Sequence, residues 1–296
     1  MTALNKKNLN STLVFLLFVL PALGAVLLSV EIPFLMSVGY SFTRWNGLDR
    51  VPVFIGMENF KELFLDDPDM MGALSFTFRQ AVFVVILINV IALCLAIFLD
   101  REIRGKNVLR AAFFIPNIMS LIVIGYIWRF IFSRSLDSFY EIVKLPFLTY
   151  SWLGNPNLAF ISVMIVTVWQ AVGFYLIIYI AGLQVIPRDL IEASMIDGAN
   201  EISRFFKITV PLLMPSITVA VFYSISNSLK AFDVVFSLTS GGPGTSTTPI
   251  ALDIYRTAFI TSRFGYGTAK SVLLFLLILS ITFFQVKMFK KWEVEA

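Results

Sequence analysis

Polar and charged residues that could bind a partner protein are concentrated in one short segment of this chain. The segment runs from Glu192 to Pro215, reads EASMIDGANEISRFFKITVPLLMP, and lies between two strongly apolar stretches. Its carboxylates can pair with basic residues of another protein, and its alanines and glycine allow two backbones to approach closely. The composition of this segment therefore predicts a docking site for a second protein.

The first half of the segment is predicted to form a short helix over about 190–197. Asp189, followed three residues later by Glu192, matches a capping box at the start of a helix, and Gly198 suits the left-handed position after its end. Asn200 is placed to cap a second short helix. Capping alone would explain Glu192, so this local pattern leaves open whether its carboxylate also meets a partner. Three apolar residues that follow are expected to pack against neighbouring helices: Phe205, Phe206 and Ile208.

This sequence contains few residues of the types that catalyse reactions or bind metals. The chain has no histidine and a single cysteine, Cys94, so a typical His/Cys zinc site or a Ser-His-Asp triad cannot be built. The glycine-rich run 240–244 lacks the Gly-Lys-Ser/Thr ending of a phosphate-binding loop. We therefore expect no catalytic residue, no metal site and no ATPase site in this chain.

The composition indicates a membrane protein. Apolar residues make up 58% of the chain and charged residues 14%, against about 25% charged in a typical soluble domain. Six segments are long and apolar enough to cross about 30 Å of hydrocarbon. We expect the spans at 13–38, 76–99, 110–132, 158–184, 209–231 and 269–288. The sequence thus predicts one all-α, polytopic helical bundle.

The distribution of lysine and arginine predicts the orientation of this bundle. If the N-terminus is cytoplasmic, the inside segments 1–12, 100–110, 187–208 and 287–296 hold 12 of these residues in 55 positions. The outside loops 39–75, 134–157 and 232–268 hold 7 in 98 positions. This bias is the one expected for cytoplasmic loops, so the docking segment and both termini are predicted to be cytoplasmic. The net charge of +4 is explained by topology, and we expect no nucleic-acid partner.

Uncharged polar residues lie near the middle of two predicted spans, where no ionisable residue is found. They fall on one face of the fourth span and one face of the fifth: Thr167, Gln170 and Phe174, and Ser224, Asn227 and Ser228. If the two faces meet, they would form a pocket of hydroxyls, amides and an aromatic ring, suited to an uncharged polar solute. The alternative is plain hydrogen bonding between helices, and the sequence leaves both open.

Other polar residues of the spans are expected to have structural roles. Arg79, Arg129 and Lys270 lie near span ends and are expected to extend to the outer interface. Asn89, alone in the second span, is predicted to hydrogen-bond a neighbouring helix. Glu31 could either reach the interface or pair inside the bundle.

The docking segment resembles the signature loop of permease subunits of binding-protein-dependent ABC importers. That loop has Glu-Ala-Ala, three residues, Gly, nine residues, then Ile-x-Leu-Pro. This chain has Glu192-Ala193-Ser194, Gly198 and Ile208-Thr209-Val210-Pro211 at the same spacing. Asp197, Ala199 and Pro215 fit the carbohydrate branch of the family. A second, shorter pattern of carbohydrate permeases resembles 232–243, which places Asp233, Gly241 and Gly242 at the outer mouth of the pathway.

The resemblance implies the six-helix fold of type I importer permeases, with 1–75 as tail, first span and first outer loop, 76–288 as a five-helix core domain, and 289–296 as a cytoplasmic tail. It implies a coupling helix that docks on an ATPase subunit through Glu192, Ala193, Asp197, Gly198 and Ala199. The implied partners are a second homologous permease, two ATPase subunits that bind ATP and magnesium, and an extracytoplasmic sugar-binding protein. This chain would hold no cofactor and would lie in the cytoplasmic membrane of a bacterium or archaeon.

The sequence favours a sugar, most simply an oligosaccharide, as the solute, and two alternatives stay open. A glycerol-phosphate importer would require cationic groups along the path, for which Lys230 is a candidate. A carrier that works without ATP would require ionisable residues within the spans, and the central regions have none.

Overall fold

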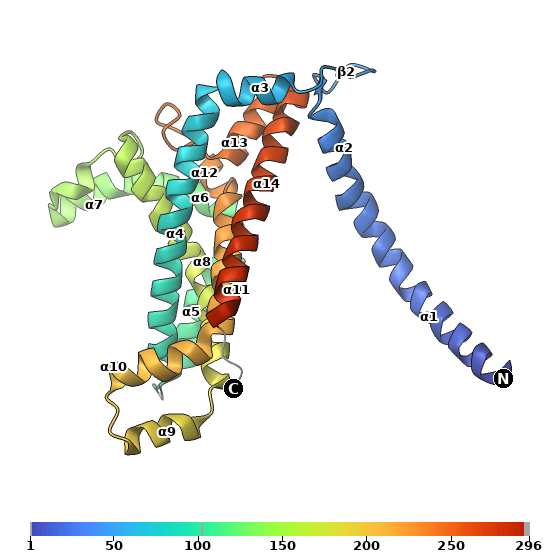
Figure 1. Cartoon of the computed structure of the whole chain (residues 1–296). Coiled ribbons are helices and arrows are strands. Elements are labelled where there is room, and N and C mark those ends of the chain that lie inside the picture. Colours follow the sequence, from blue (N-terminus) through green and yellow to red (C-terminus); the bar gives the residue numbers. More distant parts are fainter. Residues whose placement is uncertain (1, 102, 293–296) are drawn as a thin grey trace. The chain divides into compact units, whose positions relative to one another are not determined.

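The computed structural model describes residues 2–101 and 103–292, so 293–296 of the predicted C-terminal tail lie outside the described residues. The chain divides into two compact units, Met1–Asp66 with Ile254–Leu273, and Asp67–Asp253 with Leu274–Ala296. Described residues are helical almost throughout, and Figure 1 shows the helices in chain order from blue to red.

The first unit holds the N-terminal helix and a small hairpin. Its elements are α1 (Thr2–Val26), a π-helical turn (Leu27–Glu31), α2 (Ile32–Tyr40), β1 (Thr43–Arg44), β2 (Val53–Phe54), α3 (Glu58–Leu65) and a π-helical turn (Arg256–Ile260). The strands are antiparallel, with Thr43 opposite Phe54. The buried Asn59 of α3 donates from Nδ2 to the carbonyls of Ser41 and Thr43, at 2.8 and 2.9 Å, which fixes α3 against the hairpin.

The first unit also joins two segments that the sequence places on the outer side of the membrane. The Gly265 amide donates to the carbonyl of Trp45 at 2.9 Å, and both nitrogens of the Arg263 guanidinium bond the Glu62 carboxylate, at 2.7 and 2.6 Å. Loops 39–75 and 232–268 therefore meet, as two loops on one side of a membrane can.

The second unit holds the larger set of helices. Its elements are α4 (Pro68–Asp100), α5 (Lys106–Ile118), α6 (Leu121–Phe130), a π-helical turn (Ile131–Ser135), α7 (Leu136–Val143), a 3-10 turn (Pro146–Thr149), α8 (Pro156–Val185), α9 (Arg188–Ile196), α10 (Glu201–Arg204), a π-helical turn (Phe205–Thr209), α11 (Val210–Leu229), α12 (Asp233–Leu238), and a 3-10 turn (Lys290–Trp292). Two further helices share residues with the first unit: α13 (Ile250–Tyr255) and α14 (Phe264–Phe289).

Local sequence explains where the long helices begin. The Asp67 carboxylate accepts a hydrogen bond from the Met70 amide at 2.8 Å at the start of α4, and Asn155 caps α8 in the same way. A proline follows each cap at the first helical position, where its missing N–H costs nothing. Cap and proline together set the start of each span.

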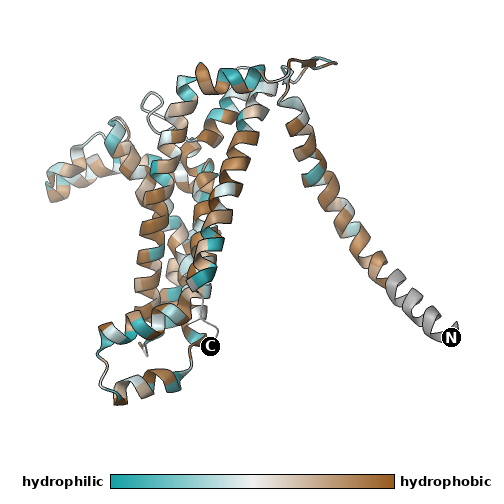
Figure 2. Ribbon diagram, viewed as in Figure 1, coloured by the Kyte–Doolittle hydropathy of each residue, from teal (hydrophilic) through white to brown (hydrophobic). Residues whose placement is uncertain are grey.

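Among the described residues, five helices are long and apolar enough to cross a membrane, and Figure 2 shows the ribbon coloured by the hydropathy of their residues. They are Val14–Tyr40, Pro68–Asp100, Pro156–Val185, Glu201–Leu229 and Phe264–Phe289, and they match five of the six predicted spans. The third predicted span, 110–132, corresponds to a pair of helices separated by a sharp bend. There the chain bends by 96° between Lys106–Ile118 and Leu121–Ser135, since Met119 and Ser120 leave the helical conformation.

The core of the second unit is built on α8, which packs along α4 and also contacts α5 and α11. Gly173 makes the crossing of α5 and α8 possible, because a Cβ there would overlap the Phe113 carbonyl and the Phe114 backbone. Gly182 has the same role against Leu213 and Ser216 of α11. These close crossings hold the polar faces of α8 and α11 in fixed register.

Candidate functional site: the α9 segment and the polar face of α8 and α11

The predicted docking helix exists and lies at the end of the second unit, beyond α10 (Figure 1). It ends as predicted at Gly198, whose φ is +78°. The Gly198 amide donates to the Met195 carbonyl at 3.1 Å and the Ala199 amide to the Ser194 carbonyl at 3.0 Å. This pair of bonds is a Schellman motif, which requires a left-handed residue after the helix and so accounts for the glycine.

The predicted capping box is wrong. The helix begins at Arg188, the N-cap is Pro187, and no side chain caps it. Because Pro187 already fixes the start, Asp189 and Glu192 both lie inside the helix, where Asp189 can still favour its N-terminus electrostatically. Glu192 is exposed and has no hydrogen bond or salt bridge to a described residue. Its carboxylate is therefore not needed for capping and is accessible to a partner.

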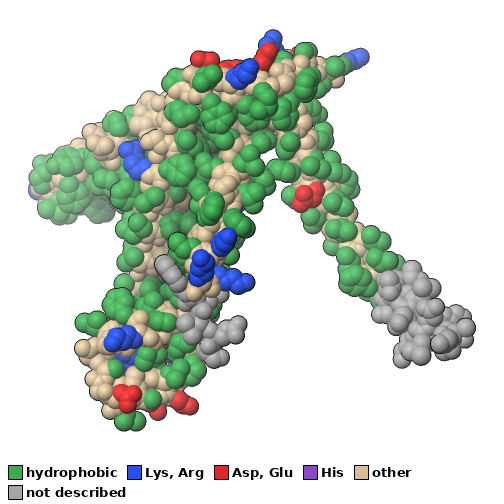
Figure 3. Space-filling model, viewed as in Figure 1, with side chains coloured by type: hydrophobic (Ala, Val, Ile, Leu, Met, Phe, Trp, Pro, Cys, Tyr) green, Lys and Arg blue, Asp and Glu red, His purple; other side chains and the backbone are tan. Residues whose placement is uncertain are grey.

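The α9 segment combines acidic and apolar exposure. Glu192, Ala193, Asp197 and Gly198 are exposed and Ala199 is half-buried, and Figure 3 shows acidic side chains at this end of the unit. Ile196 is 87% exposed. Clustered apolar exposure of this kind is typical of a protein-binding surface.

The second short helix is capped as predicted, because the Asn200 side chain accepts from the Ser203 amide at 2.7 Å. Phe205 and Ile208 are half-buried. Phe206 is 64% exposed, so the prediction that it packs against the bundle is wrong. Its ring contacts only the edge of Phe205 among the ring pairs of the described residues, and it extends the exposed apolar surface beyond α9.

The polar face of α8 is left without hydrogen bonds inside the described chain. The Thr167 hydroxyl is buried and has no partner among the described residues. Gln170 is 8% exposed, and its amide makes no hydrogen bond to a described residue. An unpaired polar group in a membrane span is costly. Gln170 keeps some exposure and is therefore placed to bond something outside the described residues, namely a second chain, water or a solute.

The polar face of α11 divides into two environments. Ser224 and Ser228 are buried. The Ser224 hydroxyl accepts from Asn89 Nδ2 at 3.0 Å, and Asn89 Oδ1 accepts from the Tyr179 hydroxyl at 2.6 Å. Asn89 thus links α4, α8 and α11, which confirms its predicted structural role. Asn227, one turn from Ser224, is exposed.

Aromatic residues bring the α8 and α11 faces together beside Asn227. The rings of Phe174 and Tyr223 lie 4.9 Å apart, and the Asn227 side chain lies within reach of the Tyr175 hydroxyl. Tyr223 and Tyr175 were not predicted from sequence. The available signal for Tyr223 was its spacing, since it precedes Asn227 by four residues and so shares its side of the helix.

A second polar residue that sequence reasoning missed lies in α4. Gln80 is fully buried, and neither its amide oxygen nor its amide nitrogen has a partner among the described residues. Nothing in the hydropathy pattern distinguishes it from a residue at a span end, because it lies close to Arg79.

The predicted outer-mouth residues belong to an ordered corner and not to a flexible loop. Asp233 begins α12, which packs on α6. Gly241 has a φ of +81°, and its carbonyl accepts from the Thr247 amide and the Thr248 hydroxyl, both at 3.1 Å. The Gly242 carbonyl accepts from the Thr247 hydroxyl at 2.6 Å. Hydrogen bonds from Thr247 and Thr248 therefore hold this glycine-rich run in a defined turn.

The charged residues near span ends differ from one another. Arg129 is exposed as expected. Lys270 is 2% exposed, and its ammonium donates to the Thr257 hydroxyl at 3.2 Å and lies over the Tyr266 ring. The prediction that Lys270 extends to the interface is wrong, because these inward partners lie within its own unit. Glu31 is exposed on the N-terminal helix.

Comparisons of this chain with known proteins agree on one protein family. Residues 88–293 match a family model described as the binding-protein-dependent transport system inner membrane component. The chain is 42% identical over 279 residues to a probable starch degradation products transport system permease protein of Thermoanaerobacterium thermosulfurigenes, with 94% of each chain covered. It is 35% identical over 262 residues to a multiple sugar-binding transport system permease protein of Streptococcus mutans, covering 88% of this chain and 90% of that one.

A solved structure shows the same fold. A chain in the crystal structure of a bacterial alginate ABC transporter, in complex with an alginate pentasaccharide-bound periplasmic protein, superposes with a TM-score of 0.81. The alignment covers 95% of this chain and 96% of that one, at 19% identity. At this identity the likeness shows the fold alone.

Proposed function

Because the chain belongs to the family of binding-protein-dependent transport system inner membrane components, we propose that it is the permease subunit of an ATP-driven oligosaccharide importer. The two relatives above are sugar permeases by name and match nearly end to end, which supports a sugar as the solute. The polar face of α8 and α11 supports the same choice. Sugars are bound by hydrogen-bonding groups and aromatic faces, and Gln170, Asn227 and Tyr223 supply both without a buried charge.

The proposed assembly contains this chain, a second homologous permease, two ATPase subunits and an extracytoplasmic sugar-binding protein. This chain would form half of the pathway, with both termini in the cytoplasm. ATP and magnesium would be bound by the ATPase subunits, and this chain would bring no cofactor of its own. The hydrogen bonds that Thr167 and Gln170 lack would be made across the pathway, to the second permease, to water or to the passing sugar.

The observation that carries the proposal is the α9 segment. A short helix closed by a Schellman motif, with an unpaired Glu192 and exposed apolar residues, has the shape and chemistry of a docking element. ATP-driven closure of the ATPase subunits would move α9, and α10 would carry the movement into the continuous helix Glu201–Leu229. Glu192, Ala193, Asp197, Gly198 and Ala199 would make the contact.

The test is co-purification of the tagged chain in mild detergent, followed by an ATPase assay with and without candidate oligosaccharides and their binding protein. We expect recovery of a second permease and an ATPase, with sugar-dependent stimulation. Glu192→Arg reverses the charge without straining the backbone and should lower stimulation at least tenfold. Glu201→Arg, an equal change on the exposed α10, is the matched control and should keep stimulation near that of the unchanged complex.

Two results would overturn the proposal. One is sugar-stimulated ATPase activity that is unchanged by Glu192→Arg combined with Gly198→Arg. The other is a chain that purifies alone and moves solute in vesicles without ATP. A response to glycerol phosphate in place of sugars would favour the runner-up substrate. Lys230, at the C-cap of α11, would then be the residue to test.

A further inference from the structure

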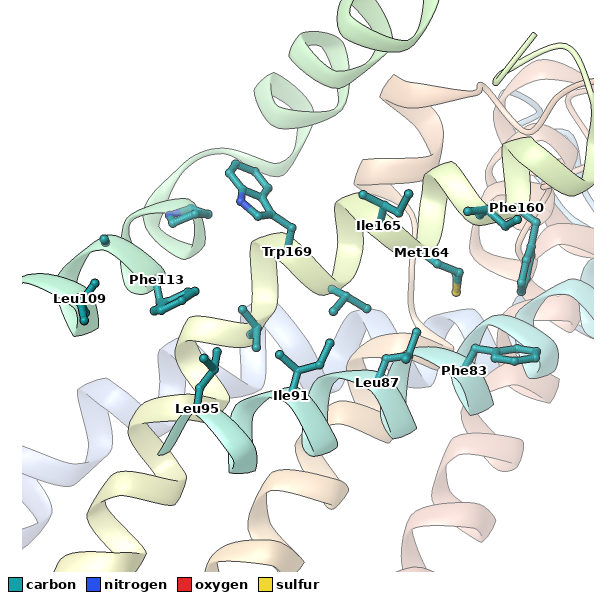
Figure 4. Close-up of a pocket in the computed structure, with 15 residues that line it drawn as sticks. Phe83, Leu87, Ile91, Leu95, Leu109, Phe113, Phe160, Met164, Ile165 and Trp169 are labelled. Carbon is teal, nitrogen blue, oxygen red and sulfur yellow. The ribbon is translucent and has the colours of Figure 1, made fainter. Parts of the chain in front are cut away.

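An apolar groove of about 840 Å³ lies between α4, α5 and α8 (Figure 4). Its fifteen lining side chains are all aliphatic, aromatic or proline, and carry no charge. One wall is a stripe of α4 at spacing i, i+4, i+8 and i+12: Phe83, Leu87, Ile91 and Leu95. Phe160 and Trp169 of α8 form part of the opposite wall.

A single arginine stands at the head of this stripe. Arg79 precedes Phe83 by four residues, so it lies on the same side of α4. Its guanidinium lies over the Phe160 ring, 4.7 Å from the centroid, and Phe160 contacts Phe83 edge-on at 5.8 Å. Arg79 takes part in none of the salt bridges found among the described residues. The groove thus begins at an exposed cation with no carboxylate bound to it.

Arg79 lies at the depth of lipid phosphates. Between Arg79 and Asp100, α4 has 20 consecutive uncharged residues, about 30 Å of helix, which matches the hydrocarbon thickness of a bilayer. The two charged residues therefore mark the two surfaces of the hydrocarbon. From Phe83 to Leu95 the groove wall runs about 18 Å along the helix, from about 6 Å to about 24 Å below Arg79. An acyl chain that starts at Arg79 would therefore lie along its outer part, within the ~15 Å of one leaflet.

We propose that this groove is a binding site for one anionic glycerophospholipid, with its phosphate at Arg79 and an acyl chain along the α4 stripe. Charge and lining favour a lipid. Arg79 supplies the charge complement of a phosphate, and the lining side chains, apolar except for the indole N–H of Trp169, suit hydrocarbon. Acyl chains are thin and flexible enough to lie along an open groove of this length.

The test uses the intact transporter complex in membranes. The probes are phosphatidylglycerol and phosphatidylcholine that carry the same photoreactive diazirine on the acyl chain, with adducts mapped by peptide mass spectrometry. We expect adducts on the groove-lining stretches 83–95, 109–116 and 160–172. The yield should be about fivefold higher for phosphatidylglycerol, the preference expected from one arginine near an anionic lipid surface.

Two variants test the arginine and the apolar walls of the groove separately. Arg79→Gln should reduce the preference to about onefold, and Arg129→Gln, which removes another exposed arginine of the outer interface, should leave it unchanged. Ala112→Trp places a large ring in the groove and should reduce adducts from both lipids. Melting temperature and gel filtration of each complex verify the fold. If Arg79→Gln does not assemble, a loss of preference at high salt in the unchanged complex serves in its place.

Three results would overturn the proposal. Equal labelling by the two lipids would show that the site does not recognise the headgroup. An unchanged preference in Arg79→Gln would show that Arg79 does not bind the phosphate. Absence of adducts in the groove, with labelling elsewhere on the same helices, would show that a protein segment covers it.

Discussion

The hydrogen bonds of Asn89 allow a sharp test of which polar residues hold the helices together. Asn89→Leu removes two bonds between helices, from Nδ2 to Ser224 at 3.0 Å and from the Tyr179 hydroxyl to Oδ1 at 2.6 Å. Hydrogen bonds between membrane helices average about 0.6 kcal/mol each. The substitution also leaves the Tyr179 hydroxyl, in a side chain that is 1% exposed, without an acceptor, at a cost of about 1–3 kcal/mol. We expect a total destabilisation of about 2–4 kcal/mol.

The assay is reversible unfolding in mixed dodecyl maltoside and SDS micelles, followed by circular dichroism. The matched control is Asn157→Leu, the same change at an exposed position in the first turn of α8, which should cost less than about 0.5 kcal/mol. A double-mutant cycle with Tyr179→Phe isolates the pair. The double variant has no orphaned hydroxyl, so it should be about 1 kcal/mol more stable than the sum of the single effects predicts.

The reasoning is refuted if Asn89→Leu costs no more than Asn157→Leu, or if Asn89→Leu and Tyr179→Phe are additive. Either result would mean that Asn89 does not make these two hydrogen bonds in the membrane, and that its amide is free to contact a solute in the pathway.

Two further predictions concern packing and the pathway. Gly173→Ala should prevent assembly or lower the melting temperature by several degrees, since its Cβ would overlap the Phe113 carbonyl, and Gly24→Ala, where a Cβ meets nothing, is its control. A melting temperature equal to that of Gly24→Ala would contradict the close crossing. Gln170→Leu should leave the melting temperature of the complex nearly unchanged and lower oligosaccharide uptake in proteoliposomes about 2- to 10-fold, the effect of one lost hydrogen bond of about 0.5–1.5 kcal/mol. A large drop in melting temperature with normal uptake would instead make Gln170 a structural residue.

The positions of most spans could be predicted from sequence because hydrocarbon thickness sets their length. Prediction gave 158–184 where the helix is Pro156–Val185, and 269–288 where it is Phe264–Phe289. The bend within the third span was not predicted, because a hydropathy window measures length and composition and does not register a change of direction. The bend at Met119–Ser120 does not lower the mean hydropathy of the segment, so the hydropathy pattern does not indicate it.

Local signals near α9 were predictable where a residue type has one structural use. Gly198 and Asn200 were assigned correctly, because a left-handed position and an N-cap each favour few residue types. The capping box failed because two starts were available within three residues. Pro187 is the N-cap, and once the helix begins at Arg188, Asp189 lies two positions too late to cap it.

Sequence spacing could not separate the structural polar residues of the spans from those facing the pathway, but hydrogen-bond accounting can. Ser224 and Asn227 lie three residues apart on one broad face, and spacing alone treats them as equivalent. In hydrocarbon each polar group needs a partner, so a group satisfied within its own chain has its role explained by the fold. Ser224 is satisfied by Asn89, whereas Thr167 and Gln170 are satisfied by no described residue. It follows that the α8 face, with Asn227 and Tyr223 beside it, is the side of this bundle that must be completed from outside the described chain.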